Sequence, residues 1–173
     1  MEGKLFMQKA YECIIRQDFE MAIEAFEQAV NHEPTNAFYR YSLSITYARS
    51  NKLNKAIEHA EEACRLAPLS NNYRLHLQTL IAKDYLHQAE QWLYKDHIRL
   101  GEAESLLKRA RELDPLSIEA HLMLALAYGI QERYNEAISI LLEASKLDPQ
   151  HVEVKQLLTD YEWMRNKHRS NLS

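Results

Sequence analysis

Glycine and proline are scarce in this chain, and their scarcity excludes most β-rich architectures. The 173 residues contain three glycines and four prolines. Hairpins and tight β-turns depend on these two residue types. The hydrophobic content of 46% and the charged content of 27% are those of a folded, soluble chain. The composition therefore predicts an all-α protein.

Cysteine, long apolar runs and excess positive charge are also lacking. Cys13 and Cys64 both fall among apolar helix positions, so we expect two buried free thiols in a reducing compartment, with a disulfide as the alternative. The sequence has no apolar run of the length that spans a membrane, and its first residues lack the apolar stretch of a signal peptide. The net charge is −4, so no overall positive field attracts nucleic acid or anionic lipid. We expect a cytoplasmic protein without membrane insertion or nucleic-acid binding.

The positions of the prolines reveal an internal repeat. Pro34 and Pro68 are 34 residues apart, as are Pro115 and Pro149, and the middle interval is 47 residues, which is 13 longer. Alanines recur with the same spacing in two columns: Ala22, Ala56, Ala103 and Ala137, and Ala29, Ala63, Ala110 and Ala144. A fixed period of this length is typical of repeat proteins.

Each repeat has the pattern of a helix pair. Ala22, Phe26 and Ala29 fall at i, i+4 and i+7, which is one face of an α-helix. Small alanines on that face allow two helix axes to approach closely. Each proline follows the second helix, and the residues after it are predicted to cap the next helix through Thr35, Ser70 and Ser117.

These columns resemble those of the tetratricopeptide repeat (TPR), a family of stacked helix–turn–helix units that form a right-handed superhelix. The resemblance implies an α-solenoid of antiparallel helix pairs, with residues 1–173 as a single domain. The repeats would span residues 3–36, 37–70, 71–117 and 118–151, and a capping helix would span 152–168.

The 13 extra residues predict one over-long helix near residues 71–97. The segment contains no Gly or Pro, so the insertion would lengthen the first helix of its unit by about 20 Å and rotate its end by about 220°. We therefore predict two lobes, about 1–82 and 86–173, that share this helix and interrupt the concave groove. The alternative is an insertion that is looped out without any effect on stacking.

The over-long helix carries an apolar stripe that needs a cover. Two interpretations remain open: cover by Leu106, Leu107 and Ala110 of the same unit, or a homodimer or partner interface centred on Trp92. The stripe consists of Tyr85, Leu86, Ala89, Trp92 and Leu93.

The sequence contains no pattern that carries catalysis or binds a cofactor. There is no Gly-rich phosphate loop, no H-E-x-x-H, no C-x-x-C and no G-x-S-x-G. His59 and Glu62 share a helix face, which favours a solvent-side contact over a metal site. We expect a protein that is not an enzyme and has neither cofactor nor metal.

The resemblance places a partner-binding groove on the first helix of each unit. Carried over to this chain, the groove positions are Met7, Tyr11, Phe38, Tyr41, Ile45, Leu75, Thr79, Leu122 and Leu126. The family also contains a Lys/Asn/Arg clamp for the C-terminal carboxylate of heat-shock chaperones. Met7, Tyr11, Ser42, Asn72 and His76 occupy the matching places here, so the clamp is absent.

The expected function is that of a non-catalytic scaffold or adaptor that binds a partner polypeptide segment in an apolar concave groove. The alternatives are a chaperone-like holder of a secreted or membrane-bound client and a self-associating structural subunit.

Overall fold

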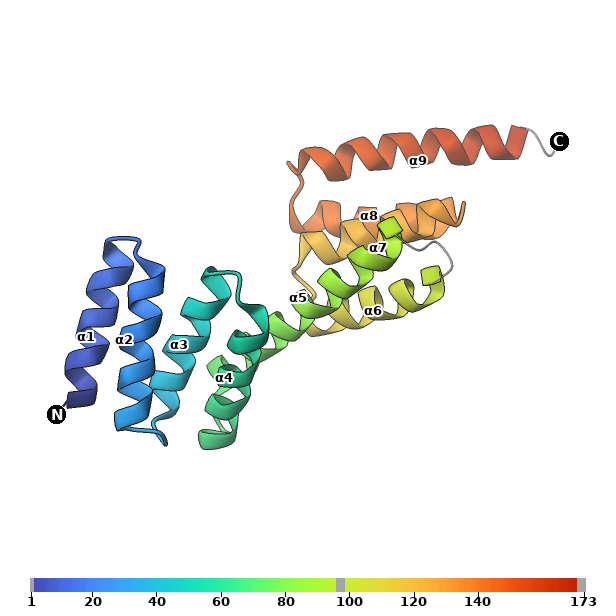
Figure 1. Cartoon of the computed structure of the whole chain (residues 1–173). Helices are drawn as coiled ribbons and strands as arrows, with labels where there is room; N and C mark the ends of the chain where they lie inside the picture. The colour runs from blue at the N-terminus through green and yellow to red at the C-terminus, as the bar shows by residue number, and fades with distance from the viewer. Residues whose placement is uncertain (1, 96–98, 171–173) are drawn as a thin grey trace. The chain divides into compact units, whose positions relative to one another are not determined.

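The computed structural model describes residues 2–95 and 99–170, and these residues form helices joined by short turns, without a strand. The all-α prediction is confirmed. The helices are α1 (Glu2–Ile15), α2 (Phe19–His32), α3 (Ala37–Arg49), α4 (Leu53–Leu66), α5 (Asn71–Lys95), α6 (Leu100–Leu113), α7 (Ile118–Ile130), α8 (Tyr134–Leu147) and α9 (Val152–Ser170) (Figure 1).

The prolines end the second helix of each pair through the residue that precedes them. The residues before the four prolines have φ between −131° and −137°, outside the helical region. A proline ring disfavours the helical conformation of the preceding residue, so the helix stops one position earlier. These C-cap residues are Glu33, Ala67, Asp114 and Asp148.

The turn within a helix pair uses a left-handed residue that is not glycine. Gln17, Asn51 and Glu132 have φ of 62°, 57° and 59°. In each turn the next N–H bonds to the carbonyl five residues earlier at 2.9 Å, as in Arg133 to Tyr128. This is the Schellman arrangement, in which glycine is the usual left-handed residue.

The N-caps agree with the prediction at Ser70 and Ser117, whose hydroxyls accept the N–H groups of Tyr73 and Ala120 at 3.5 and 3.1 Å. The prediction for Thr35 is wrong. Asn36 caps α3 instead, because its side chain accepts two backbone N–H groups of the first turn.

The contacts divide the chain into unit 1, Met1–Ile81, and unit 2, Ala82–Ser173. The boundary is close to the predicted limits of the lobes. α5 crosses it as one continuous helix of 25 residues, so the over-long helix is confirmed and the looped-out insertion is wrong. The last two positions predicted for this helix, 96 and 97, lie outside the described residues.

In unit 1 the core lies between α1, α2, α3, α4 and the first part of α5. Phe26, Leu43 and Tyr47 are its largest fully buried side chains, and Leu80 of α5 is buried with them. The alanines of the repeat columns are buried as well, so the helices of a pair pack closely. Cys13 and Cys64 are free thiols, half-buried rather than fully buried.

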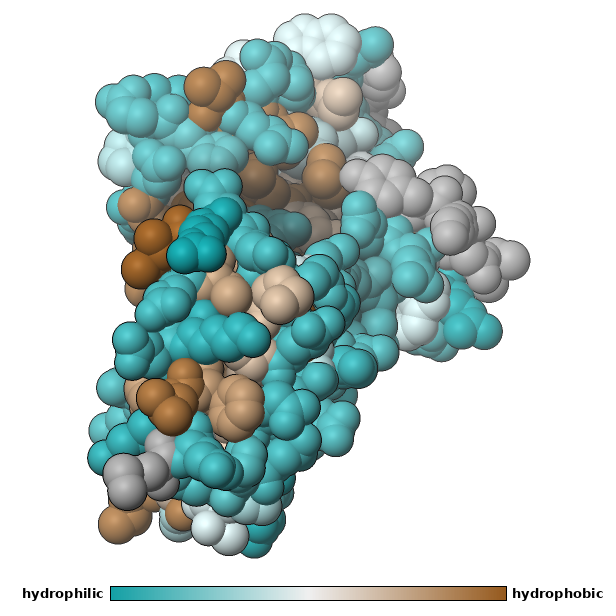
Figure 2. Space-filling model, turned by 60° about the vertical axis from the view of Figure 1, so that its left-hand side comes forward, coloured by the Kyte–Doolittle hydropathy of each residue, from teal (hydrophilic) through white to brown (hydrophobic). Residues whose placement is uncertain are grey.

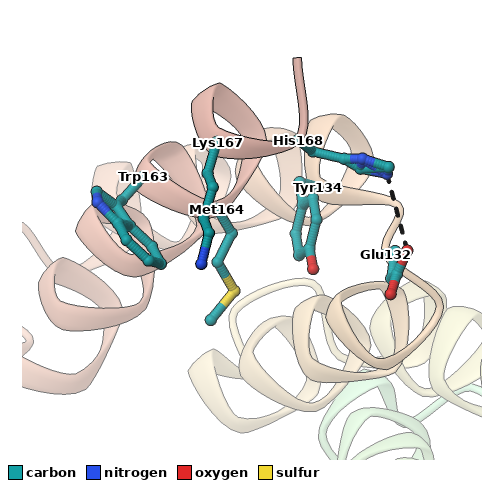
Figure 3. Close-up of a pocket in the computed structure, with 6 residues that line it drawn as sticks. All are labelled: Glu132, Tyr134, Trp163, Met164, Lys167 and His168. Atoms are coloured by element: carbon teal, nitrogen blue, oxygen red, sulfur yellow. Dashed lines mark ion pairs between the residues drawn. The ribbon is translucent and has the colours of Figure 1, made fainter. Parts of the chain in front are cut away.

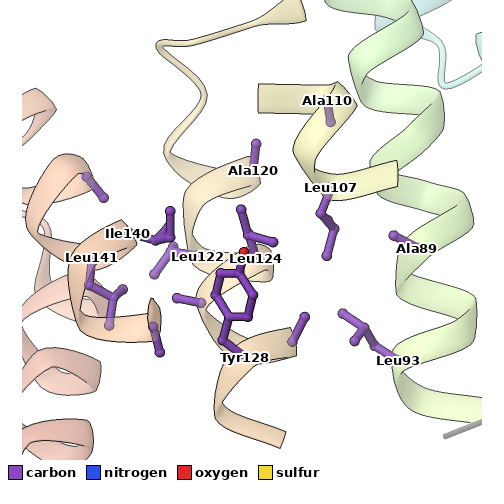
Figure 4. Packing of buried hydrophobic residues seen from close by; sticks show 14 of the residues in the cluster. Ala89, Leu93, Leu107, Ala110, Ala120, Leu122, Leu124, Tyr128, Ile140 and Leu141 are labelled. Carbon is purple, nitrogen blue, oxygen red and sulfur yellow. The ribbon is translucent and has the colours of Figure 1, made fainter. Parts of the chain in front are cut away.

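In unit 2 the second part of α5 packs with α6, α7, α8 and α9. Figure 4 shows Ala89 and Leu93 of α5 facing Leu107 of α6, with Tyr128 of α7 beside them. Gly129 of α7 is in contact distance of Tyr161 of α9, and that ring fills the space a side chain would need.

Candidate functional site

Unit 1 carries a group of exposed apolar side chains on the first helices of its pairs. Phe38 is 48% exposed, Tyr11 43% and Leu75 59%. With Tyr41 and Tyr73 they form what we call the aromatic face. Large apolar residues rarely gather on the surface without a role in binding.

Tyr41 is held in place by two neighbouring rings. Its ring centroid is 4.6 Å from that of Tyr73 and 5.2 Å from that of His76, which it meets edge-on. Burial is the main cause that raises the pKa of Tyr73 and the cause that lowers the pKa of His76. Tyr73 therefore stays a neutral phenol and His76 a neutral imidazole at pH 7.

A hydrogen-bond chain fixes the orientation of His76. The buried Ser44 hydroxyl donates to the Ala56 carbonyl at 2.7 Å, and the Nε2 atom of His76 lies 2.8 Å from the same hydroxyl oxygen. Because the serine proton is already used, Nε2 of His76 is the donor. Tyr11 is held in a similar way, since its hydroxyl shares a 3.3 Å hydrogen bond with Ser42.

Two of the predicted groove residues are largely buried. Met7 is buried in the core of unit 1, because it lies with Gly3 and Ala10 on the inner stripe of α1. Leu122 is buried because α7 packs against both α6 and α8. Ile45 and Leu126 are half-buried, and Thr79 is exposed.

Leu122 and Leu126 nevertheless contribute to a pocket of about 340 Å³ in unit 2. We call it the acidic pocket. Its walls come from α5, α7 and the start of α9, and it is lined by Glu90, Ile118, Glu119, Leu122, Met123, Leu126, His151 and Glu153. Sequence reasoning placed Glu119 and the two leucines together on α7 and missed Glu90 and Glu153, which come from two other helices.

The apolar stripe of α5 is covered within unit 2. Leu86, Ala89 and Leu93 are buried in its core, and Tyr85 and Trp92 are partly buried against that core. Leu106, Leu107 and Ala110 belong to the same cluster, so the intramolecular cover is present. Because Leu86, Ala89 and Leu93 are buried, they offer no surface to a second copy. Self-association stays a prediction that concerns the exposed parts of Tyr85 and Trp92.

A second pocket, of about 430 Å³, lies between α9 and the beginning of α8 (Figure 3). Trp163 is 61% exposed there, with the Lys167 amine 4.9 Å from its ring centroid. His168 and Glu132 form an ion pair of 3.8 Å at the other end. The sequence predicts Trp163, Lys167 and His168 on the last helix but gives no sign that they lie close to Glu132 and Tyr134.

Neither metal ligation nor membrane spanning is found among residues 2–95 and 99–170. No group of three or more His, Cys, Asp or Glu side chains is placed to hold a metal ion. No described helix is long and apolar enough to cross a membrane. His59 stacks on Tyr47, with ring centroids 5.5 Å apart, and Glu62 binds Arg65.

Figure 2 shows hydrophilic residues over most of the face drawn, with apolar side chains in small groups among them.

Comparison with known proteins identifies the repeat on both sides of α5. Two sequence models described as tetratricopeptide repeat match residues 16–71 and residues 99–161, together more than half of the chain. No curated protein matches this sequence significantly.

Solved structures share the fold at low sequence identity. A MamA RS-1 ArsTM double mutant is 20% identical, with a TM-score of 0.60, over 98% of this chain and 88% of that chain. MamA 41-end from Desulfovibrio magneticus RS-1 is 19% identical, with a TM-score of 0.59 and the same shares of each chain. At these identities the similarity shows the fold alone.

The family supports the role of a protein–protein interaction scaffold. With the repeat matched on both sides of α5 and the described residues folded into stacked helix pairs, this chain belongs to the tetratricopeptide repeat family.

Proposed function

We propose that this protein is a non-catalytic adaptor that binds a segment of a partner polypeptide on the aromatic face of unit 1. The observation that carries the proposal is the exposure of Phe38, Tyr11 and Leu75 on the first helices of unit 1, together with a Tyr41 ring that Tyr73 and His76 hold in place. Aromatic side chains with few rotamers are favoured anchors in protein interfaces, since little entropy is lost when a partner covers them. The free thiols Cys13 and Cys64 are in keeping with a reducing compartment.

The expected ligand is a short segment with apolar side chains. The three exposed residues come from α1, α3 and α5, so one segment that contacts all of them must cross three helices. Segments of this kind bind by placing successive apolar side chains between the anchors. Truncation of a central anchor to Ala weakens the free energy of binding by about 1–2 kcal/mol, which is about a tenfold loss of affinity.

The test is a peptide selection on the full chain, followed by fluorescence anisotropy with the selected peptides. Phe38→Ala and Leu75→Ala should each weaken binding about tenfold, and the double variant more. Leu69→Ala is the matched control, because Leu69 is 94% exposed in the turn between α4 and α5 and lies off the aromatic face. The proposal fails if Phe38→Ala, Leu75→Ala and Leu69→Ala bind the selected peptides equally well.

Tyr41→Ala tests whether the face is preorganised. This change removes the ring that Tyr73 and His76 contact, and we expect it to weaken binding at least as much as Phe38→Ala while light scattering shows an unchanged mass. A change in mass would favour the self-associating subunit instead. Tight binding of an unfolded client, with no binding of the same protein folded, would favour the chaperone-like holder.

A further inference from the structure

The acidic pocket of unit 2 combines an apolar floor with a rim of one charge sign. Leu122 and Leu126 of α7 form part of the floor, and Glu90, Glu119 and Glu153 come from α5, α7 and α9. At about 340 Å³ it is at the small end of the range for ligand pockets, about 300–1,000 Å³. The size suits one or two side chains rather than a whole helix.

The three carboxylates have no basic partner among residues 2–95 and 99–170. By contrast, Glu104 in the same unit pairs with Lys108 at 2.7 Å and with Arg133 at 2.8 Å. Neither Lys nor Arg lines the pocket, and the one histidine there, His151, accepts the Val154 N–H through Nδ1.

Helix dipoles account for only part of this arrangement. Glu119 and Glu153 lie in the first turns of α7 and α9, where a negative charge is favourable. Glu90 lies five residues before Lys95, the last described residue of α5, on the C-terminal side of that helix, where the dipole gives a negative charge no stabilisation. The pocket therefore keeps a negative field over an apolar floor.

We propose that the acidic pocket binds a partner segment in which a large aliphatic side chain is flanked by Arg or Lys. The aliphatic side chain contacts Leu122 and Leu126, and the cations contact the rim. Arg and Lys suit this position because their methylene stems cover apolar surface while their charged ends stay in water. The inference rests on the proposed function and names the chemistry of a segment that unit 2 accepts.

The test uses fluorescence anisotropy with the full chain and three short peptides that differ only beside a central Leu: Arg on both sides, Gln on both sides, or Glu on both sides. Exposed ion pairs contribute about 0.2–1 kcal/mol each, so the Arg peptide should bind about fivefold more tightly than the Gln peptide, and the Glu peptide should bind worst. High salt should reduce the difference.

The Glu90→Gln/Glu119→Gln/Glu153→Gln variant should lose the preference for Arg. Its matched control is Glu61→Gln/Glu112→Gln/Glu162→Gln, which removes the same charge at exposed positions outside the pocket. Leu126→Ala should weaken the Arg and Gln peptides alike, because it removes part of the floor. Thermal unfolding of each variant checks that the fold is kept.

Three failures are distinguishable. If the Arg and Gln peptides bind equally and Leu126→Ala weakens both, the pocket binds apolar segments and the charge inference is wrong. If none of the three peptides binds the wild-type chain, segment binding by this pocket is wrong as well. Equal loss of the Arg preference in the rim variant and its matched control would show that overall charge, not the rim, is responsible.

Discussion

Gly129 provides the clearest quantitative test of how α9 packs against α7. A Cβ atom at this position would lie 2.5 Å from Cζ and 2.9 Å from Cε1 of Tyr161, and closer still to its hydroxyl oxygen. Tyr161 is buried in the core of unit 2, and burial raises the pKa of its hydroxyl. The ring can therefore yield only by overpacking the core or by leaving it.

The two opposing contributions can be compared. Exchange of Gly for Ala in an unobstructed helix raises the free energy of unfolding by up to about 1 kcal/mol. Overpacking costs about 1–3 kcal/mol. We predict that Gly129→Ala lowers the free energy of unfolding by about 1 kcal/mol, and that the same change raises it in a Tyr161→Ala background, where the obstruction is absent.

Urea unfolding followed by far-UV circular dichroism measures all four members of this double-mutant cycle. The expected coupling energy is about 2 kcal/mol, within the usual range for residues in contact, about 0.5–3 kcal/mol. Limited trypsin digestion, which cleaves at Lys167 when α9 detaches, provides an independent readout. If Gly129→Ala stabilises the protein equally in both backgrounds, the packing of Tyr161 does not require glycine at position 129, and the reasoning is wrong.

Three further predictions concern stability. Gln17→Gly should raise the free energy of unfolding by about 0.5–1 kcal/mol, because the backbone of Gln17 is in the left-handed conformation that glycine adopts without strain. Gln8→Gly, inside α1, should lower it by about 1 kcal/mol. Changes of the same sign for both variants in urea unfolding would contradict this prediction. Leu107→Ala should lower the free energy of unfolding by about 2–5 kcal/mol because the Leu107 side chain is fully buried. Leu116→Ala, at an exposed leucine in a turn, should lower it by less than about 0.5 kcal/mol. Equal losses for the two variants would contradict the assignment of Leu107 to the core. Burial lowers the pKa of His76, so below about pH 6.5 the unfolded state binds more protons and stability falls as the pH drops towards the folded-state pKa. The melting temperature should therefore be lower at about pH 5.5 than at about pH 7.5, and His76→Gln should reduce that difference; an unchanged difference would contradict the role of His76.

Helix positions could be predicted because they depend on local rules. Each proline restricts only the residue before it, so Pro34 and Pro149 set the ends of α2 and α8 without reference to the rest of the fold. The length of α5 followed in the same way, because no residue between Asn71 and Lys95 breaks a helix. The N-cap Asn36 was missed by one position, since the choice between adjacent polar residues depends on backbone angles that the sequence does not show.

The candidate sites were less predictable because they depend on contacts between helices. The sequence placed Phe38 and Leu75 at groove positions of their helices, and both side chains are exposed in the structure. Met7 could not be separated from them, because its burial depends on how neighbouring helices cover α1. The contact of Tyr73 with Tyr41 was also missed, since it joins residues 32 positions apart through side-chain orientation.

The continuity of α5 across the boundary between Ile81 and Ala82 decides how this protein can be dissected. A cut at that boundary would divide the helix in its interior and create two new ends, each with about four backbone groups that lack partners. It would also place Leu80 and Ala82, which are buried in different cores, at the frayed ends of the two helix fragments. Fragments meant to fold separately must therefore overlap, with residues 71–95 present in both.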